Sequence, residues 1–263
     1  MAGGHRVLAV GALGRMGERV RAAVAAEPAL RLGAALEAPD HPGLGTTVED
    51  GVRVGDDVKA ALAQADVAID FTLPAATLAN LRAAADAGVA YVTGTTGFSQ
   101  EQRAEITQLA AHIPVLHAPN FSVAVNVLAW LTREAARKLG TDYDAEIVEL
   151  HHAAKRDAPS GTALRLGEAI AEGRDQKLSD HVILERAGDV GARPDAAIGI
   201  QTLRGGDNPG EHTVLFAGRG ERLELAHRSH TRDHFARGAV RAALWLLGRP
   251  PGLHRIEEAL GLD

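Results

Sequence analysis

The sequence predicts an α/β protein in which a doubly wound, parallel-sheet dinucleotide-binding domain is joined to a smaller α+β domain with a mixed sheet. Strand-like and helix-like segments alternate from residue 6 to residue 116, which is typical of a parallel sheet covered on both faces. A glycine-rich turn joins the first strand to the first helix. Between residues 181 and 227 strand-like segments follow one another with few helices, which indicates a mixed or antiparallel sheet.

The composition is that of an ordinary globular protein. Its 263 residues, 46% of them hydrophobic, are enough for one or two domains with a real core. A net charge of −6 without a basic block argues against nucleic acid or an acidic membrane as a partner. The absence of cysteine excludes disulfides and a cysteine nucleophile. Without a long apolar segment or a signal peptide, we expect a cytoplasmic protein.

The first strand, residues 6–10, leads into glycines at positions 11, 14 and 17, and then into a helix with Val20 and Val24 on one face. This G-x-x-G-x-x-G spacing is a variant of the dinucleotide fingerprint, in which glycine lets the backbone approach a pyrophosphate. Such turns also occur without a cofactor. Glu37 follows the next strand, residues 30–36, at a distance suited to the ribose hydroxyls. Fingerprint and acid together favour dinucleotide binding.

The alternation continues through the first 120 residues. We predict helices over 58–65, 75–87 and 100–111, and strands over 67–71, 89–92 and 113–116. Small or polar residues follow three of these strands, at 70–72, 94–97 and 118–122. Each group could be present only because such residues form turns. Because ligands of such sheets bind beyond the carboxyl ends of the strands, their common location indicates one cofactor groove.

The second half is predicted to hold a long helix over 123–139, strands over 145–150, 181–185, 198–203, 211–217 and 222–227, and helices over 163–171, 232–247 and 253–260. A sheet with one uncovered face tends to pair with a copy of itself. We therefore expect an oligomer.

One segment, residues 149–163, concentrates reactive groups: E-L-H-H-A-A-K-R-D-A-P-S-G-T-A. It has the pattern of a strand, a loop and a helix start. Backbone N–H groups of Ser160, Gly161 and Thr162 at the helix start would hold an anion. Lys155 adds a positive charge, and a neighbouring histidine can transfer a proton near neutral pH. These groups suit a small acidic substrate, whereas the simpler reading is a capped helix with surface side chains.

The same segment fills every fixed position of E-x-H-H-x-x-K-x-D-A-P-S-G-T-A, and in this it resembles the dihydrodipicolinate reductase family of the diaminopimelate–lysine pathway. The resemblance implies NADH- or NADPH-dependent reduction of 4-hydroxy-tetrahydrodipicolinate, via dihydrodipicolinate, to tetrahydrodipicolinate. It implies a dinucleotide-binding domain over 1–122 completed by 233–263, and a substrate-binding and oligomerisation domain over 123–232. It also implies a homotetramer built through the second domain's sheet.

The resemblance further implies a role for each site residue. His151 would be the general acid, and Lys155 would pair with a substrate carboxylate and assist protonation. On a strand, adjacent histidines point to opposite faces, so their roles could be exchanged. The other residues expected to bind the substrate carboxylates are Thr96, His152, Ser160, Gly161 and Thr162. The cofactor would contact Gly11, Ala12, Leu13, Gly14, Arg15, Met16 and Gly17 at the pyrophosphate, Glu37 at the ribose, and Gly94, Thr95, Thr96, Ala118, Pro119, Asn120 and Phe121 beside the nicotinamide.

The residue after Glu37 bears on the choice between NADH and NADPH. Family members often have arginine there, and that arginine can pair with the 2′-phosphate of NADPH. Ala38 occupies the position in this chain, which favours NADH. Arg15 could still reach the phosphate, so dual use stays open.

Other functions fit the sequence less well. His227, His230 and His234, with Asp233, could be metal ligands, but they fall on a strand and a helix rather than on one helical face, so we predict no metal site. The chain could also be a different two-domain nicotinamide-dependent dehydrogenase, such as homoserine dehydrogenase. The pattern of residues 149–163 argues against this alternative. A dinucleotide-sensing regulator would need the site lost or a partner-binding region gained.

Overall fold

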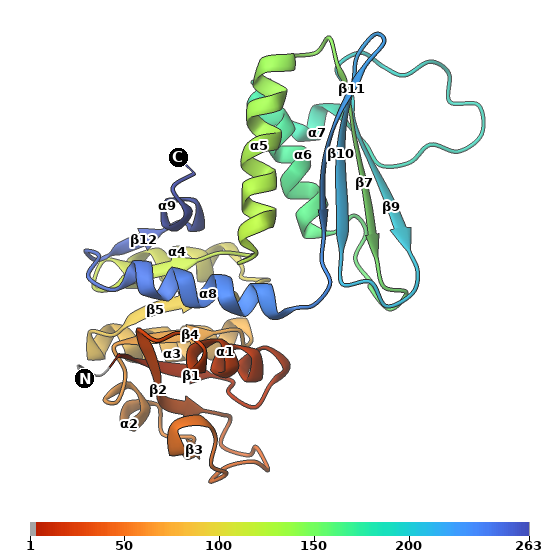
Figure 1. The fold of residues 1–263 in the computed structure, drawn as a ribbon. Helices are drawn as coiled ribbons and strands as arrows, with labels where there is room; N and C mark the ends of the chain where they lie inside the picture. The colour runs from red at the N-terminus through yellow and green to blue at the C-terminus, as the bar shows by residue number, and fades with distance from the viewer. Residues whose placement is uncertain (1–3, 263) are drawn as a thin grey trace. The chain divides into compact units, whose positions relative to one another are not determined.

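The computed structural model describes residues 4–262, and its chain divides into two compact units. Unit 1 runs to Val123 and resumes at Asp233, and unit 2 spans Ala124–Arg232. The elements, labelled in Figure 1, are β1 His5–Val10, α1 Arg15–Ala25, β2 Leu30–Leu36, the 3₁₀ turn η1 Glu49–Gly51, β3 Val54–Gly55, α2 Val58–Leu62, β4 Val67–Asp70, α3 Pro74–Ala87, β5 Ala90–Thr93, α4 Gln100–Ala110, β6 Pro114–His117, α5 Val123–Leu139, β7 Asp144–His151, α6 Gly161–Gly173, α7 Leu178–His181, β8 Val182–Ile183, β9 Ile198–Arg204, β10 Glu211–Ala217, β11 Arg222–Arg228, α8 Asp233–Leu246, β12 Gly252–His254 and α9 Ile256–Leu260.

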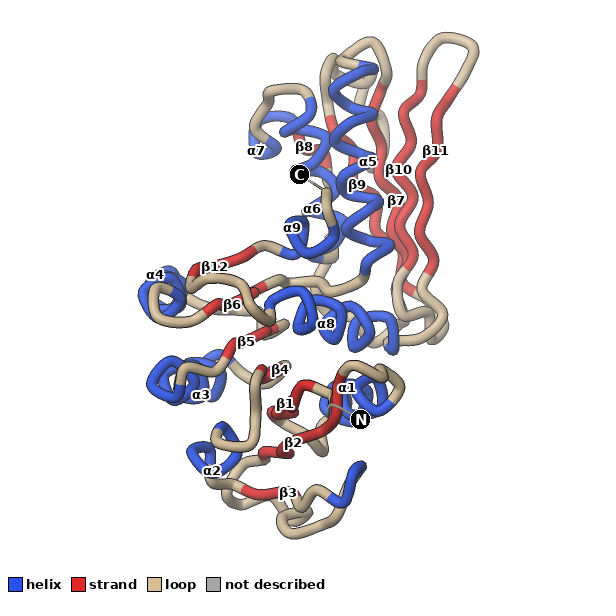
Figure 2. The backbone as a smooth tube through the Cα atoms, turned by 60° about the vertical axis from the view of Figure 1, so that its left-hand side comes forward, coloured by secondary structure: helices blue, strands red, loops and turns tan. Residues whose placement is uncertain are grey.

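Unit 1 is a seven-stranded sheet in the order β12-β6-β5-β4-β1-β2-β3, and neighbouring strands pair in parallel. Figure 2 shows α2, α3 and α4 along one side of these strands and α1 and α8 along the other. The central strands are therefore buried on both faces, which explains their continuous apolar sequences. The doubly wound parallel sheet predicted for this part is confirmed.

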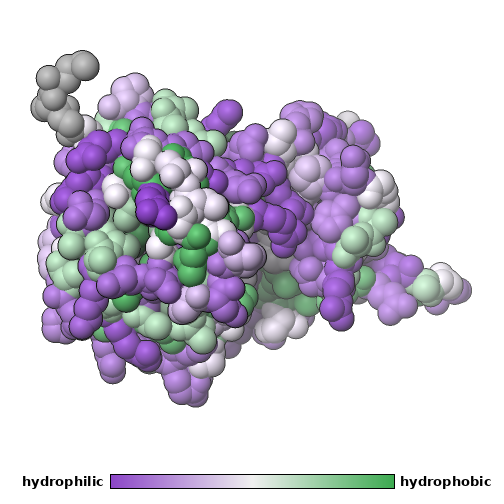
Figure 3. Space-filling view, turned by 90° about the horizontal axis from the view of Figure 1, so that it is seen from below, coloured by the Kyte–Doolittle hydropathy of each residue, from purple (hydrophilic) through white to green (hydrophobic). Residues whose placement is uncertain are grey.

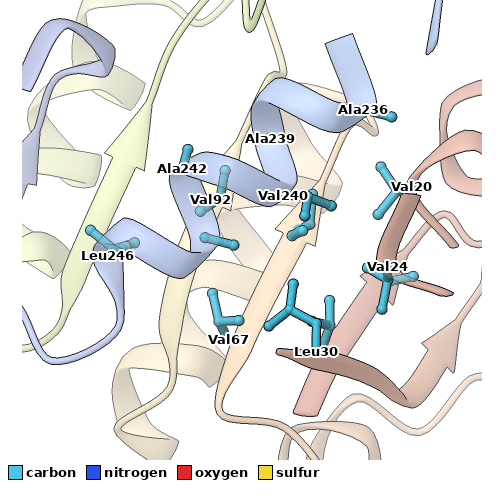
Figure 4. Packing of buried hydrophobic residues seen from close by; sticks show 14 of the residues in the cluster. Val20, Val24, Leu30, Val67, Val92, Ala236, Ala239, Val240, Ala242 and Leu246 are labelled. Atoms are coloured by element: carbon cyan, nitrogen blue, oxygen red, sulfur yellow. The ribbon is translucent and has the colours of Figure 1, made fainter. Parts of the chain in front are cut away.

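Helix α8 belongs to unit 1 although it begins more than 100 residues after the end of α4. It packs beside α1, and alanines let it approach the sheet closely (Figure 4). A Cβ atom on Gly238 would lie only 1.8 Å from the carbonyl oxygen of Phe121, so a larger residue could not occupy that position. The side of the sheet covered by α1 and α8 is built from Val20, Val24, Leu30, Val67, Val92, Ala236, Ala239, Val240, Ala242 and Leu246.

Unit 2 is a five-stranded sheet in the order β11-β10-β7-β9-β8. Strand β10 pairs antiparallel with β7 and β11, while β9 pairs in parallel with β7 and β8, so the sheet is mixed as predicted. Helices α5, α6 and α7 lie on one side of it (Figure 1). Alternate residues of the strands form the core with α6: Ala145, Ile147, Leu166, Ile170, Ile198, Ile200, Val214 and Phe216.

Some predicted element bounds were wrong. The segment 253–260 begins as an edge strand, β12, which pairs with β6, and only then becomes α9. The predicted helix 58–65 ends at Leu62, and the predicted strand 181–185 shrinks to two residues after a short helix. Two-residue β3 was not predicted. Such short strands are defined by their partners in the sheet, because two or three residues carry no periodic pattern of their own.

The surface agrees with the composition. Hydrophilic residues cover most of the face seen in Figure 3, with hydrophobic residues scattered between them. Within residues 4–262, no helix combines the length and the apolar character needed to cross a membrane. Residues 1–3 and 263, which lie at the ends of the predicted domain ranges, are outside the described residues.

Candidate active site

The glycine turn after β1 is tight. Gly11 has φ +65°, a left-handed conformation that favours glycine, and the N–H of Gly14 donates to the carbonyl oxygen of Gly11 at 3.0 Å. A Cβ atom on Gly17 would lie 2.0 Å from the same carbonyl oxygen. The start of α1 is thus pressed against the end of β1, while Gly14 and Arg15 stay exposed at the helix N-terminus. This is a backbone surface that a pyrophosphate can approach.

Glu37 lies beside this turn. It directly follows β2, is half-buried, and its carboxylate accepts a hydrogen bond from the N–H of Leu13 at 2.7 Å. The acid predicted for the ribose and the turn predicted for the pyrophosphate therefore lie together. Ala38 comes next and is exposed.

A buried network of hydroxyl groups joins the ends of β4 and β5. Asp70 is fully buried and accepts hydrogen bonds from the hydroxyl of Tyr91 at 2.5 Å and the hydroxyl of Thr72 at 2.6 Å. Thr77 links this pair to Thr95, with oxygen–oxygen distances of 3.2 and 2.8 Å. Burial, and then the Asp70 carboxylate, raise the pKa of Tyr91 well above its ordinary value, so the phenol stays protonated as a donor.

The residues predicted for the nicotinamide side gather at the ends of β5 and β6. Thr93 holds both segments, since its hydroxyl accepts from the N–H of Thr95 at 3.1 Å and its carbonyl oxygen accepts from the N–H of Ala118 at 3.2 Å. A Cβ atom on Gly94 would lie 2.0 Å from the ring of Phe71. Thr96 and Pro119 are exposed in these turns, Asn120 is half-buried and Phe121 is buried.

In unit 2 the centre of the candidate site is Glu149, a fully buried carboxylate on β7. Its Oε1 accepts from the N–H of Ser160 at 3.0 Å, the hydroxyl of Thr202 at 3.2 Å and Nη2 of Arg204 at 3.1 Å. Its Oε2 accepts from Nη1 of Arg204 at 3.0 Å and contacts Nδ1 of His151. Burial raises the pKa of Glu149, but Arg204, the Ser160 N–H and His151 outweigh it, so the pKa is lowered and the group stays anionic.

His151 ends β7 and is 8% exposed. With Nδ1 directed to Glu149, the remaining ring nitrogen, Nε2, is the one available for proton transfer. Burial lowers the pKa of His151; the Glu149 carboxylate opposes this, whereas Lys155 and Arg204 add to it. The ring of His212 packs edge-on against His151, with 5.1 Å between ring centroids.

Ser160 is the N-cap residue of α6 and is part of the same cluster. Its hydroxyl accepts from the N–H of Ala163 at 3.1 Å as an N-cap and lies 3.2 Å from Nε2 of His212. The N–H of Ser160, which we expected to hold an anion, is instead donated to Glu149. That expectation is corrected, because a fully buried carboxylate eleven residues earlier takes up this donor. Gly161 and Thr162 form the first turn of α6 at the positive end of its dipole.

Lys155 is held by a neighbouring carboxylate. Its Nζ lies 2.8 Å from both oxygens of Asp157, and the ammonium group lowers the pKa of that exposed carboxylate. A substrate carboxylate could replace Asp157 as the partner of Lys155, because Asp157 can turn to solvent. His152 lies just beyond β7, half-buried, where its N–H donates to the carbonyl oxygen of Asn208 at 2.8 Å.

Two histidine clusters bear on the metal question. His227 lies on β11 and His234 on α8, elements of different units, so the structure gives them no common helical face. The ligand atoms of Glu149, His151 and His212 lie within 4.8 Å of one another, close enough for one ion. The guanidinium of Arg204 on Glu149, however, already supplies the positive charge at this carboxylate. We interpret the cluster as a hydrogen-bonded one.

Comparison with known proteins agrees with this geometry. The family models "Dihydrodipicolinate reductase, N-terminus" and "Dihydrodipicolinate reductase, C-terminus" match residues 5–121 and 124–260. The chain belongs to the dihydrodipicolinate reductase family. It is 51% identical over 261 residues to the 4-hydroxy-tetrahydrodipicolinate reductase of Anaeromyxobacter sp. strain Fw109-5, with 97% of both chains covered. It is 49% identical over 265 residues to that of Desulfotalea psychrophila, with 98% of both covered.

The solved structures include a member of the same family. A dipicolinate-bound dihydrodipicolinate reductase from Paenisporosarcina sp. TG-14 superposes with a TM-score of 0.77 at 26% identity, covering 97% of this chain and 98% of that one. A match of this extent places both units within the dihydrodipicolinate reductase fold.

Sequence reasoning gave no role to several residues of the cluster. Glu149 stood in the family pattern without a function, and Thr202, Arg204 and His212 were not singled out. A signal was present in the alternation of the strands. Glu149 is two residues from buried Ile147, and His212 is two residues from buried Val214. Since side chains alternate between the faces of a strand, both polar residues fall on the buried faces of their strands. Polar groups at such positions must find partners there.

Proposed function

We propose that this chain reduces 4-hydroxy-tetrahydrodipicolinate with NADH or NADPH, and that His151 delivers the proton. The activity follows from membership of the dihydrodipicolinate reductase family. Loss of water from the substrate gives dihydrodipicolinate, and addition of one hydride and one proton gives tetrahydrodipicolinate. The observation that carries the assignment of the proton donor is the buried contact of Glu149 with Nδ1 of His151, which leaves Nε2 for the substrate.

The substrate carboxylates would be bound by charge and by a helix N-terminus. Lys155 and the first turn of α6, Gly161 and Thr162, supply these groups in unit 2, with His152 beside them. Ser160 would act through its hydroxyl and through its cap on α6 rather than through its N–H. Thr96 in unit 1 is exposed and would contribute its hydroxyl.

The cofactor would be bound by unit 1. The close approach at Gly17 and the position of Glu37 beside the glycine turn fit a dinucleotide. Bound NADH or NADPH would supply the hydride. The turn from Gly11 to Gly17 would bind the pyrophosphate and Glu37 the ribose. Gly94 to Thr96 and Ala118 to Phe121 would line the nicotinamide side.

We propose that the chain prefers NADH. Ala38 is exposed beside Glu37 and offers no cation to a 2′-phosphate; within the glycine turn, Arg15 is the cation that could reach this group. An Ala38→Arg variant should raise the ratio of kcat/KM for NADPH to that for NADH by about tenfold, the effect of one charge-assisted contact worth about 1.4 kcal/mol. An unchanged ratio would show that this position does not select the cofactor.

A coupled assay tests the function. Pyruvate, aspartate semialdehyde and the upstream synthase are supplied, and the absorbance of NADH or NADPH is followed. Consumption that depends on the synthase is the expected result, and its absence with either cofactor, from folded protein, contradicts the proposal. His151→Gln should lower kcat by about 10²–10⁴-fold, the usual contribution of a positioned acid. Near wild-type turnover would remove His151 from this role.

The open face of the five-stranded sheet is our proposed oligomer interface, within a cytoplasmic homotetramer. Val148, Leu150, Leu203 and Leu215 alternate with the core residues and so point away from α6; Leu203 is 51% exposed. Light scattering after size-exclusion chromatography should give a tetramer for the wild type and smaller species for Leu215→Glu. A monomeric wild type would contradict this interface.

A further inference from the structure

We propose that Glu149 is the positioning residue of this site: it fixes the tautomer and orientation of His151 and ties that ring to the start of α6. The inference rests on the proposed function, because it gives a reason for the orientation of the proposed acid. Glu149 itself has no exposed surface, so a substrate in solution cannot reach its carboxylate. It acts through the groups that it holds.

The contacts of the carboxylate define the role. One oxygen takes the Ser160 N–H at the beginning of α6, and the other contacts Nδ1 of His151, so a single group joins the proton donor to the helix that would bind the substrate carboxylate. Arg204 spans both oxygens, at 3.0 and 3.1 Å, and neutralises the buried charge. Thr202 donates to the oxygen that also accepts from Ser160. Every donor therefore reinforces one orientation of the carboxylate.

An anionic carboxylate can only accept, so the Nδ1 of His151 must carry a proton. The neutral ring then has its lone pair on Nε2, and the protonated ring has an N–H there. Gly210 packs against Nε2: a Cβ atom at that position would lie 2.8 Å from this nitrogen. The absence of a side chain at Gly210 leaves the ring room to keep this orientation.

The charges around His151 make Glu149 necessary for the protonated ring. Arg204 on β9 and Lys155 in the loop after β7 are cations, and both disfavour a positive charge on the His151 ring. His212 on β10 is buried, and burial, His151 and His227 of β11 lower its pKa, so it remains neutral. Asp157 is paired with Lys155. Among the described neighbours, Glu149 is the anion in direct contact with His151.

The test compares two carboxylates of the same strand. Glu149→Gln keeps the shape but turns one acceptor into a donor. In either orientation the new donor opposes Arg204, together with His151 on one side or with Ser160 and Thr202 on the other. Glu146→Gln is the matched control, because Glu146 also pairs with two arginines, Arg186 and Arg193, on the other face of β7.

We expect kcat of Glu149→Gln to fall by about 10²–10⁴-fold with a much smaller change in KM, as for a histidine forced into the wrong tautomer. The decline of kcat/KM at high pH should move to lower pH, because the anion that stabilises the protonated ring is gone. Glu146→Gln should leave the pH profile in place. A Glu149→Gln enzyme with wild-type kcat and pH profile would overturn the proposal.

A double variant separates positioning from general damage to the fold. If Glu149 acts through His151, the pair Glu149→Gln and His151→Gln should be no slower than His151→Gln alone. Multiplicative losses would overturn the proposal. Should Glu149→Gln fail to fold because Arg204 is left unpaired, the variant with Arg204→Met as well removes both buried charges and is used in its place.

The wild-type protein offers an independent readout. The ¹⁵N shifts of the His151 ring distinguish the two neutral tautomers, and a proton on Nδ1 is expected. A proton on Nε2 with bare Nδ1 would overturn the proposal whatever the kinetics show. Failure of the function itself would be seen separately, as a wild-type enzyme that is inactive in the coupled assay.

Discussion

Acid should destabilise unit 2 through His212, and the magnitude can be worked out. His212 is 3% exposed, and burial, followed by the charge of His151, lowers its pKa from the usual 6.5 to about 3. The folded unit therefore binds fewer protons at this ring than the unfolded chain. The stability from neutral His212 is fully present above pH 6.5 and is lost as pH falls towards about 3.

Each pH unit within that window is worth about 1.4 kcal/mol. Between about pH 7 and about pH 4.5 the loss from His212 should be about 2.5 kcal/mol, since the unfolded ring titrates near the start of this range. In His212→Gln this dependence should be missing, because an amide can still bond to Ser160 but does not titrate. The free energy of unfolding of the wild type should thus fall by about 2.5 kcal/mol more than that of the variant.

The two tryptophans make the assay specific to unit 2. Trp130 lies on α5 and Trp245 on α8, so in a Trp245→Phe background the fluorescence of Trp130 reports unfolding of unit 2. Urea titrations of both proteins at the two pH values give the four free energies. Other groups, Glu149 among them, titrate in both proteins and cancel in the comparison. Parallel pH dependences would refute the burial of a neutral His212.

Three further predictions concern the rest of the molecule. Gly17→Ala should weaken NADH binding by at least about tenfold in a fluorescence titration, because of the backbone contact its Cβ would make, while Gly55→Ala, where nothing lies within 4 Å, should bind normally. Tyr91→Phe should lower the free energy of unfolding by about 1–3 kcal/mol, since buried Asp70 loses a donor; unchanged urea midpoints would contradict this. Lys155→Met should raise the inhibition constant of dipicolinate by about tenfold or more, and equal inhibition would exclude Lys155 from carboxylate binding.

The sequence determined the fold class because the relevant patterns are local. Apolar runs of four to seven residues alternating with amphipathic helices predict a parallel sheet, and the chain formed one from β1 to β6. The 149–163 segment carried the family by itself, since its pattern is contiguous. Weak patterns failed in the expected places, at two- and three-residue strands such as β3 and β12, whose existence depends on a partner strand.

The relation among distant residues was decided by the tertiary structure. Glu149 is 55 residues from Arg204 and 11 from Ser160, and no local pattern states that these groups meet on one carboxylate. The pairing of β7 with β9 brings Arg204 beside Glu149, because residues in register across a sheet lie about 5 Å apart whatever their distance in sequence. Ser160 reaches the same carboxylate from the start of α6. The sequence by itself determined which reactive groups the chain carries and which family it resembles. The three-dimensional packing decided that the Ser160 N–H is donated to Glu149, that His212 is buried, and which ring nitrogen of His151 contacts Glu149, because burial obliges each polar group to find a partner.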